Sequence, residues 1–255
     1  GSAGVGADGS VSNGGGRLFV FGDGREIGAQ SQLDTVAKTV LASVASAASS
    51  FGGSAAGLSL QAATDVDKAG KGSGILGFMR GGSLVSAVQT GGTNAVGAGA
   101  TAAAKLDDAN KLSDWFANAG SAAIVAGLQQ SDLAPRFKDY FGAVAAYSLT
   151  KDQADTMLAT AASVQALSAG LAPLGGVFSQ LGGLSIAATA GLAELTGGFD
   201  AFIAKSQQYV KDFYSNDEQM AISAAQVRAT LQAAGIDAGA INSKADFRAL
   251  VDSSN

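Results

Sequence analysis

The chain has 255 residues, a formal net charge of −5, and neither histidine nor cysteine. Without these two residue types it can form no disulfide, no histidine-dependent catalytic triad and no ordinary zinc site. The mildly acidic balance argues against nucleic-acid binding, which depends on clustered lysine and arginine, so we expect no sequence-specific nucleic-acid partner.

The composition is rich in glycine and poor in charge. There are 36 glycines but only 2 prolines, and charged residues make up 15% of the chain, against about 25% in typical domains. The many glycines favour close contacts between helices. The low content of charged residues is typical of a protein that other molecules enclose. Because the chain begins without methionine and ends in a polar segment, we expect a fragment of a longer polypeptide.

The first third of the chain predicts a small α+β unit over residues 17–110. Residues 1–16 are rich in glycine and serine and predict a flexible lead-in. A hairpin is expected around the Gly-Asp-Gly turn that follows residues 17–21. Apolar residues then recur at helical spacing from Leu33 to Phe51, and Gly52-Gly53 predicts the end of that helix.

Residues 57–90 change to a period of two, as expected for strands. Leu58, Leu60 and Ala62 alternate with polar residues, and two further apolar runs flank Gly81-Gly82. A glycine pair between two such runs indicates a hairpin. We therefore predict an antiparallel meander of about three strands.

Residues 111–255 predict a mostly helical region. Helices are expected around 112–128 and 133–145. Thr150 and Gln153 form a capping box before the next helix, which runs towards Ala172. No charged residue occurs from Thr156 to Ala193. This stretch is long enough to consider a membrane span, but Gly-Gly pairs and polar residues dilute it. A packed helix bundle or a subunit interface built on small residues is the alternative that we prefer, and we expect the stretch to be buried against other protein, with further copies of the chain as the first candidate.

The segment QYVKDFYSNDEQMA, which starts at Gln208, raises the question of a catalytic acid pair. Ser215 and Glu218 have the spacing of a capping box, and acidic residues are favoured at a helix N-terminus. We therefore predict a joint between two helices. The second helix carries an apolar stripe from Met220 onwards and ends at Gly235. Ser243 and Asp246 then have the spacing that marks the start of another helix.

Two further patterns resemble chemical motifs. The segment Asp65–Gly70 resembles the start of a calcium loop, but Leu76 stands where a bidentate glutamate is required. Ser148–Lys151 matches Ser-x-x-Lys without its partner motifs, and Thr150 is better used as a helix cap. The sequence therefore predicts no catalytic, cofactor-binding or metal-binding residue.

The segment from Phe199 to Asp252 resembles the C-terminal part of phage tail tape-measure proteins. The resemblance is carried by FIAKSQQYVKDFYSNDEQMAISAAQVRATLQAAGI and, after a short gap, SKADFRALVD. In that family, an aromatic-rich helix ending in Phe-Tyr precedes a serine-capped acidic helix start, a helix ending in glycine, and an acidic-Phe-Arg-x-Leu-Val block. The rest of the chain fits this family more loosely.

The resemblance implies a structural virion protein, not an enzyme, at the tail-tip end of a tape measure that sets tail length. Such a protein lies in the tail lumen and tip, is made in the host cytoplasm, and leaves before DNA ejection. Implied partners are hub proteins, tail-tube proteins and further copies, with a trimer as first expectation. The alternative is a membrane-active module whose low-charge stretch forms a DNA conduit in the host envelope.

The residues expected to mediate these interactions lie in the low-charge stretch and in the aromatic helix that follows it. They are Leu184, Ile186, Phe199, Phe202, Ile203, Phe213 and Tyr214.

Overall fold

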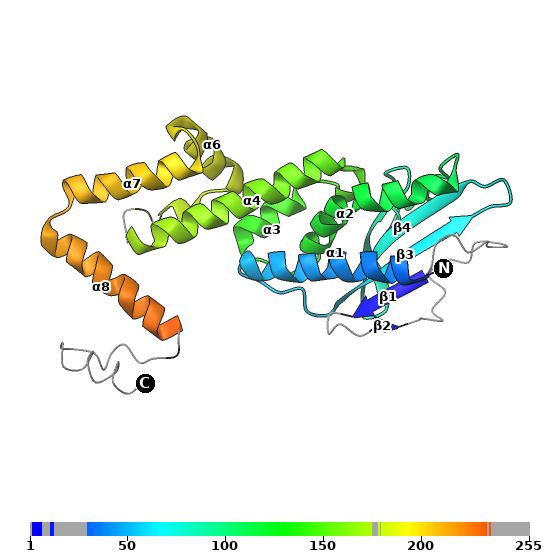
Figure 1. Cartoon of the computed structure of the whole chain (residues 1–255), viewed down its shortest axis with the longest axis horizontal. Coiled ribbons are helices and arrows are strands. Elements are labelled where there is room, and N and C mark those ends of the chain that lie inside the picture. The colour runs from blue at the N-terminus through cyan, green and yellow to red at the C-terminus, as the bar shows by residue number, and fades with distance from the viewer. Residues whose placement is uncertain are drawn as a thin grey trace. The chain divides into compact units, whose positions relative to one another are not determined.

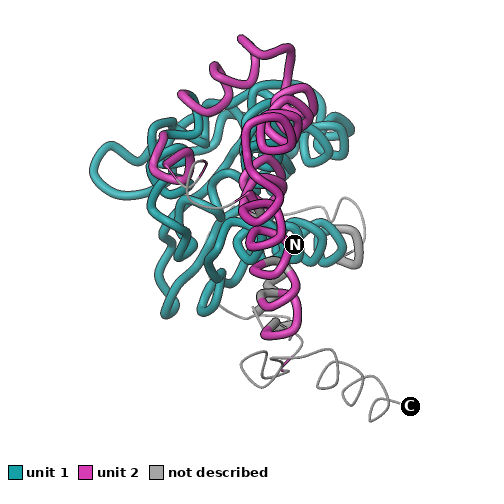
Figure 2. Tube along the Cα trace, turned by 90° about the vertical axis from the view of Figure 1, so that its left-hand side faces the viewer, with its two compact units in different colours: residues 1–165, 185–187 teal, residues 166–184, 188–255 magenta. Residues whose placement is uncertain are grey.

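The computed structural model describes residues 2–6, 11–12, 30–174, 178, 180–233 and 235. Contacts divide the chain into two compact units (Figure 2). The first comprises residues 1–165 and 185–187, and the second comprises residues 166–184 and 188–255. The fold is α+β: a helix and an antiparallel meander, followed by a mostly helical C-terminal part (Figure 1).

The first unit is built on a five-stranded antiparallel sheet with the order β2-β1-β3-β4-β5. The predicted meander is confirmed as β3 (Leu58–Val66), β4 (Gly72–Arg80) and β5 (Ser83–Gln89). Gly81 and Gly82 link β4 to β5 with φ angles of 56° and 82°. Two successive positive φ angles are what a tight hairpin turn of the primed type requires, and glycine meets this requirement without strain.

Part of the expected lead-in takes part in the sheet instead. β1 (Ser2–Gly6) pairs with β3 from Ser2↔Ala63 to Gly6↔Ser59, and β2 (Val11–Ser12) pairs with β1. Backbone hydrogen bonds do not depend on large side chains, so a segment of small residues can extend a sheet at its edge. The hairpin expected after residue 17 lies outside the described residues.

Two helices pack on one face of the sheet. α1 (Gln30–Ser50) and α2 (Leu112–Gln129) contact each other, and they contact β3 and β4 respectively. At their meeting point the backbone of Gly127 lies against the side chains of Val44 and Phe78. The change from strand to helix near residue 110 is therefore a change of secondary structure inside one compact unit.

The end of α1 is joined to the segment after α2. Gly52 has a φ of 74°, which ends the helix as predicted. Ser54 and Asp132 then exchange two backbone hydrogen bonds of 2.7 and 2.9 Å. Gly53 is needed here because a Cβ at this position would lie 1.6 Å from the Asp132 carbonyl oxygen.

Short elements complete the first unit. They are η1 (Ala109–Lys111), α3 (Pro135–Gly142), η2 (Ala146–Ser148) and the first part of α4 (Lys151–Leu171). The Phe51 ring stacks on Phe137 with centroids 4.6 Å apart. The predicted capping box before α4 is confirmed: the Thr150 amide donates to Gln153 Oε1 at 2.9 Å, and the Gln153 amide donates to Thr150 Oγ1 at 3.3 Å.

The second unit contains the end of α4, followed by short helices and two longer ones. Their bounds are η3 (Ala172–Leu174), η4 (Gln180–Gly183), most of α6 (Ile186–Thr196), α7 (Phe199–Phe213) and α8 (Asn216–Ala233). Its core consists of Leu167, Leu171, Leu174 and Val210. Leu167, Leu171 and Leu174 of the low-charge stretch are therefore buried within the chain itself.

Candidate interaction surface

The calcium-like segment is a turn whose carboxylates already have partners. Asp67 accepts hydrogen bonds from the amides of Ala69 and Lys71 at 3.0 and 2.9 Å, and from Lys105 Nζ at 3.0 Å. Lys105 lies 3.9 Å from the buried Asp65 as well. The Lys105 hydrogen bond is the main reason why the pKa of Asp67 is lowered. Within the described residues, no group of three or more acidic residues could hold a metal ion.

The Ser-x-x-Lys match is likewise part of the scaffold. Lys151 pairs with Asp155 one turn along α4, and Ser121 on α2 donates a hydrogen bond of 2.5 Å to the same carboxylate. The hydrogen bond with Asp155 raises the pKa of Lys151. An ammonium with a raised pKa holds its proton more tightly and makes a poor general base. This cluster therefore joins α2 to α4 and has no activated nucleophile.

The acidic segment after α7 is a helix joint, as predicted. The Ser215 amide donates to Glu218 Oε2 at 2.8 Å, and the Glu218 amide donates to Ser215 Oγ at 3.4 Å. The hydrogen bond from the Ser215 amide is the main reason why the pKa of Glu218 is lowered. The carboxylate thus serves the reciprocal cap that starts α8.

Exposed apolar side chains on α7 and α8 are the best candidates for contact with another molecule. Tyr209 and Phe213 lie one turn apart on α7, with stacked rings whose centroids are 4.9 Å apart. They are 46% and 73% exposed. Met220 and Val227 on α8 are also large and exposed. Aromatic and methionine side chains are enriched in protein interfaces.

Most of the described side chains of α8 are exposed. Among them, Ile222 packs against the core cluster. Met220, Ala224 and Val227 are spaced by four and three residues, so they share a face that is turned away from Ile222. The apolar stripe read from the sequence is therefore exposed at Met220, Ala224 and Val227.

The sequence-predicted interaction residues separate into two groups. Phe199, Phe202, Ile203 and Tyr214 pack partly buried against the core cluster, and Ile186 is only 1% exposed. Leu184 and Phe213 are exposed, at 37% and 73%.

Sequence reasoning overlooked Tyr209 as an interaction candidate. Its position four residues before Phe213 was the available signal, because residues at that spacing are neighbours on a helix.

No single helix among the described residues is long and apolar enough to cross a membrane. The pair α6 and α7 meets the length and composition criteria only when taken together, and it is bent by 75° at its break.

No protein-family model, no curated protein and no solved structure matches this chain.

Proposed function

We propose that the chain is a structural virion protein: the tail-tip end of a tape measure that sets tail length during assembly and leaves before DNA ejection. The observation that carries this proposal is the ordered sequence pattern from Phe199 to Asp252. The geometry of its described part is compatible with that pattern. An aromatic-rich helix ends at Phe213, Ser215 caps the next helix, and Gly235 follows it with a φ of 77°.

The bonding of the carboxylates supports a structural rather than a catalytic role. Asp67, Asp155 and Glu218 each hold a turn, a helix pair or a cap. All three have a lowered pKa, whereas a general acid at neutral pH requires a raised one. The chain also lacks histidine and cysteine.

Partners of this protein would be hub and tail-tube proteins and further copies of the chain, with three copies as the first expectation. The exposed apolar side chains of α7 and α8 would supply the contacts. Phe213 is the strongest single candidate because it is large, aromatic and 73% exposed. Aromatic residues of this kind often dominate the energy of an interface.

Localisation in virions tests this proposal. Immunoblots of denatured, purified tails should detect the chain through an epitope label. The label should be lost after DNA ejection is triggered. A chain that is absent from purified tails, or retained after ejection, would contradict the tape-measure role.

A Phe213→Ala variant tests the contact surface, and Leu195→Ala is its matched control, because Leu195 is 86% exposed on α6. Co-purification of tail-tip proteins should fall for the first variant and persist for the second. Equal recovery with both would exclude Phe213 as an anchor.

A membrane-active role is the second candidate function, because α6 and α7 together meet the length and composition criteria for a membrane span. In that role the low-charge stretch, which shares residues 186–193 with α6, enters the host envelope as part of a DNA conduit. Leakage of dye from phospholipid vesicles is the appropriate assay. Vesicles that stay sealed at high protein concentration would rule this role out for the isolated chain.

A further inference from the structure

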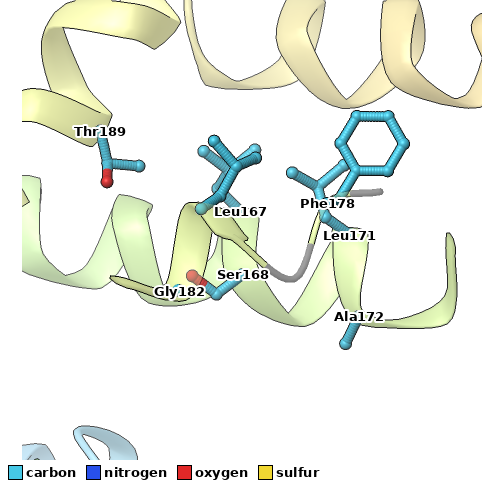
Figure 3. Close-up of a pocket in the computed structure, with 8 residues that line it drawn as sticks. Leu167, Ser168, Leu171, Ala172, Phe178, Gly182 and Thr189 are labelled. Carbon is cyan, nitrogen blue, oxygen red and sulfur yellow. The ribbon is translucent and has the colours of Figure 1, made fainter. Parts of the chain in front are cut away.

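The second unit contains a pocket with a mostly apolar lining. Its volume is about 350 Å³. The lining comes from α4, η3, η4, α6 and Phe178, and consists of Leu167, Ser168, Leu171, Ala172, Phe178, Leu181, Gly182 and Thr189. Figure 3 shows Leu167, Leu171 and Phe178 gathered on one side of α4, with Thr189 coming from α6.

The chemistry of this lining restricts what can occupy the pocket. All lining residues fall within the segment 156–193, which has no charged residue, so a charged ligand would find no counter-ion among them. Ser168 and Thr189 contribute hydroxyl groups, and the remaining side chains are hydrocarbon. A charged group placed against such a lining would lose its hydration without compensation.

Size and solvent exposure also argue for an occupant. Apolar side chains that line a solvent-open pocket stay in contact with water, and covering them with an apolar ligand is favourable. The volume lies at the lower end of the range of small-molecule sites, which are mostly apolar with few polar groups. A flexible hydrocarbon chain can fill such a space without any specific hydrogen bond.

We propose that this pocket binds an uncharged aliphatic chain of the kind found in lipid tails. The leucine and phenylalanine side chains would contact the methylene groups. This inference is independent of the tail-tip role and does not require that α6 and α7 enter a membrane.

Two neighbouring glycines provide a matched pair of variants. Gly182 lines the pocket and Gly183 does not. Neither has a positive φ, and a Cβ built on either meets no atom within 4 Å. Gly182→Leu should therefore occupy pocket space without straining the backbone, and Gly183→Leu should add the same side chain beside it.

Calorimetric titration of the whole chain with decanol, below its aggregation limit, is the first measurement. We expect one saturable site in the wild type and in Gly183→Leu, and at least about tenfold weaker binding in Gly182→Leu. Decanoate should bind more weakly than decanol because of its charge. Absence of saturable binding, or equal binding by both variants, would overturn the proposal.

A second measurement locates the ligand directly and does not use the Gly182→Leu variant. Trp115 is the sole tryptophan and lies on α2 in the first unit. In a Trp115→Phe background, Leu181→Trp places a fluorophore at the pocket lining. A terminally brominated undecanol should quench its fluorescence at the concentrations that saturate the calorimetric site. Unquenched fluorescence at saturation would place the ligand elsewhere and refute the assignment.

Discussion

Gly127 is where the fold should be least tolerant of one added methyl group. A Cβ at this position would lie 2.6 Å from Val44 Cγ2 and 2.7 Å from Phe78 Cζ. Alanine normally stabilises a helix interior by about 0.5–1 kcal/mol relative to glycine. Overpacking a well-filled core costs about 1–3 kcal/mol. Gly127→Ala should therefore lower the free energy of unfolding by roughly 0.5–2 kcal/mol.

Gly120 lies on the same helix and supplies the control. A Cβ there meets no atom within 4 Å, so Gly120→Ala should raise the free energy of unfolding by about 1 kcal/mol. Urea unfolding followed by Trp115 fluorescence reports on this unit. In a double-mutant cycle, Phe78→Leu should cost less in the Gly127→Ala background, because removing the ring relieves the clash. If Gly127→Ala stabilises the chain as Gly120→Ala does, the packing argument is wrong.

Three further outcomes are expected. Ser215→Ala should reduce the helicity of α8 in circular dichroism, because the cap acceptor of the Glu218 amide is lost; unchanged helicity would contradict the capping role. The pKa of Glu218 is lowered from 4.5, so the stability that its carboxylate adds to the fold is complete above pH 4.5 and is lost as the pH falls through the lowered pKa. Glu218→Gln should abolish this acid dependence of the free energy of unfolding. Leu184→Arg should weaken self-association in analytical ultracentrifugation without changing the melting temperature, whereas Ile186→Arg should lower the melting temperature by burying an unpaired charge. A chain that is monomeric at every concentration would refute the self-association.

Local patterns predicted the elements that are fixed by local physics. The helix from Leu33 to Phe51, the glycine-linked meander and both capping boxes depend on residues within a few positions of each other. β1 could not be found in this way. Its residues, SAGVG, have little intrinsic preference for a strand, and it forms because it pairs with β3 more than fifty positions further along the chain.

Periodicity also identified the apolar faces without showing what covers them. The spacing of Ile203 and Val210 fits a core-facing helix, and both pack in the second unit. The equally regular stripe through Met220 and Val227 is exposed. A helical repeat fixes which residues share a face, but only tertiary contacts determine whether that face meets its own chain, a partner or water.

The backbone amides of Ser54 and Asp132 hydrogen-bond to each other's carbonyl groups. Hydrogen exchange at these two amides should therefore report whether the first unit opens cooperatively. Neither bond belongs to a helix or a long strand pair, yet both connect segments far apart in the sequence. Isolated loop amides normally exchange with solvent through small local openings. Here Gly53 sits so close to the Asp132 carbonyl that the two segments must separate together. Their hydrogen-exchange rates should therefore match each other and follow the opening of the first unit as a whole, rather than the fast rates of neighbouring loops.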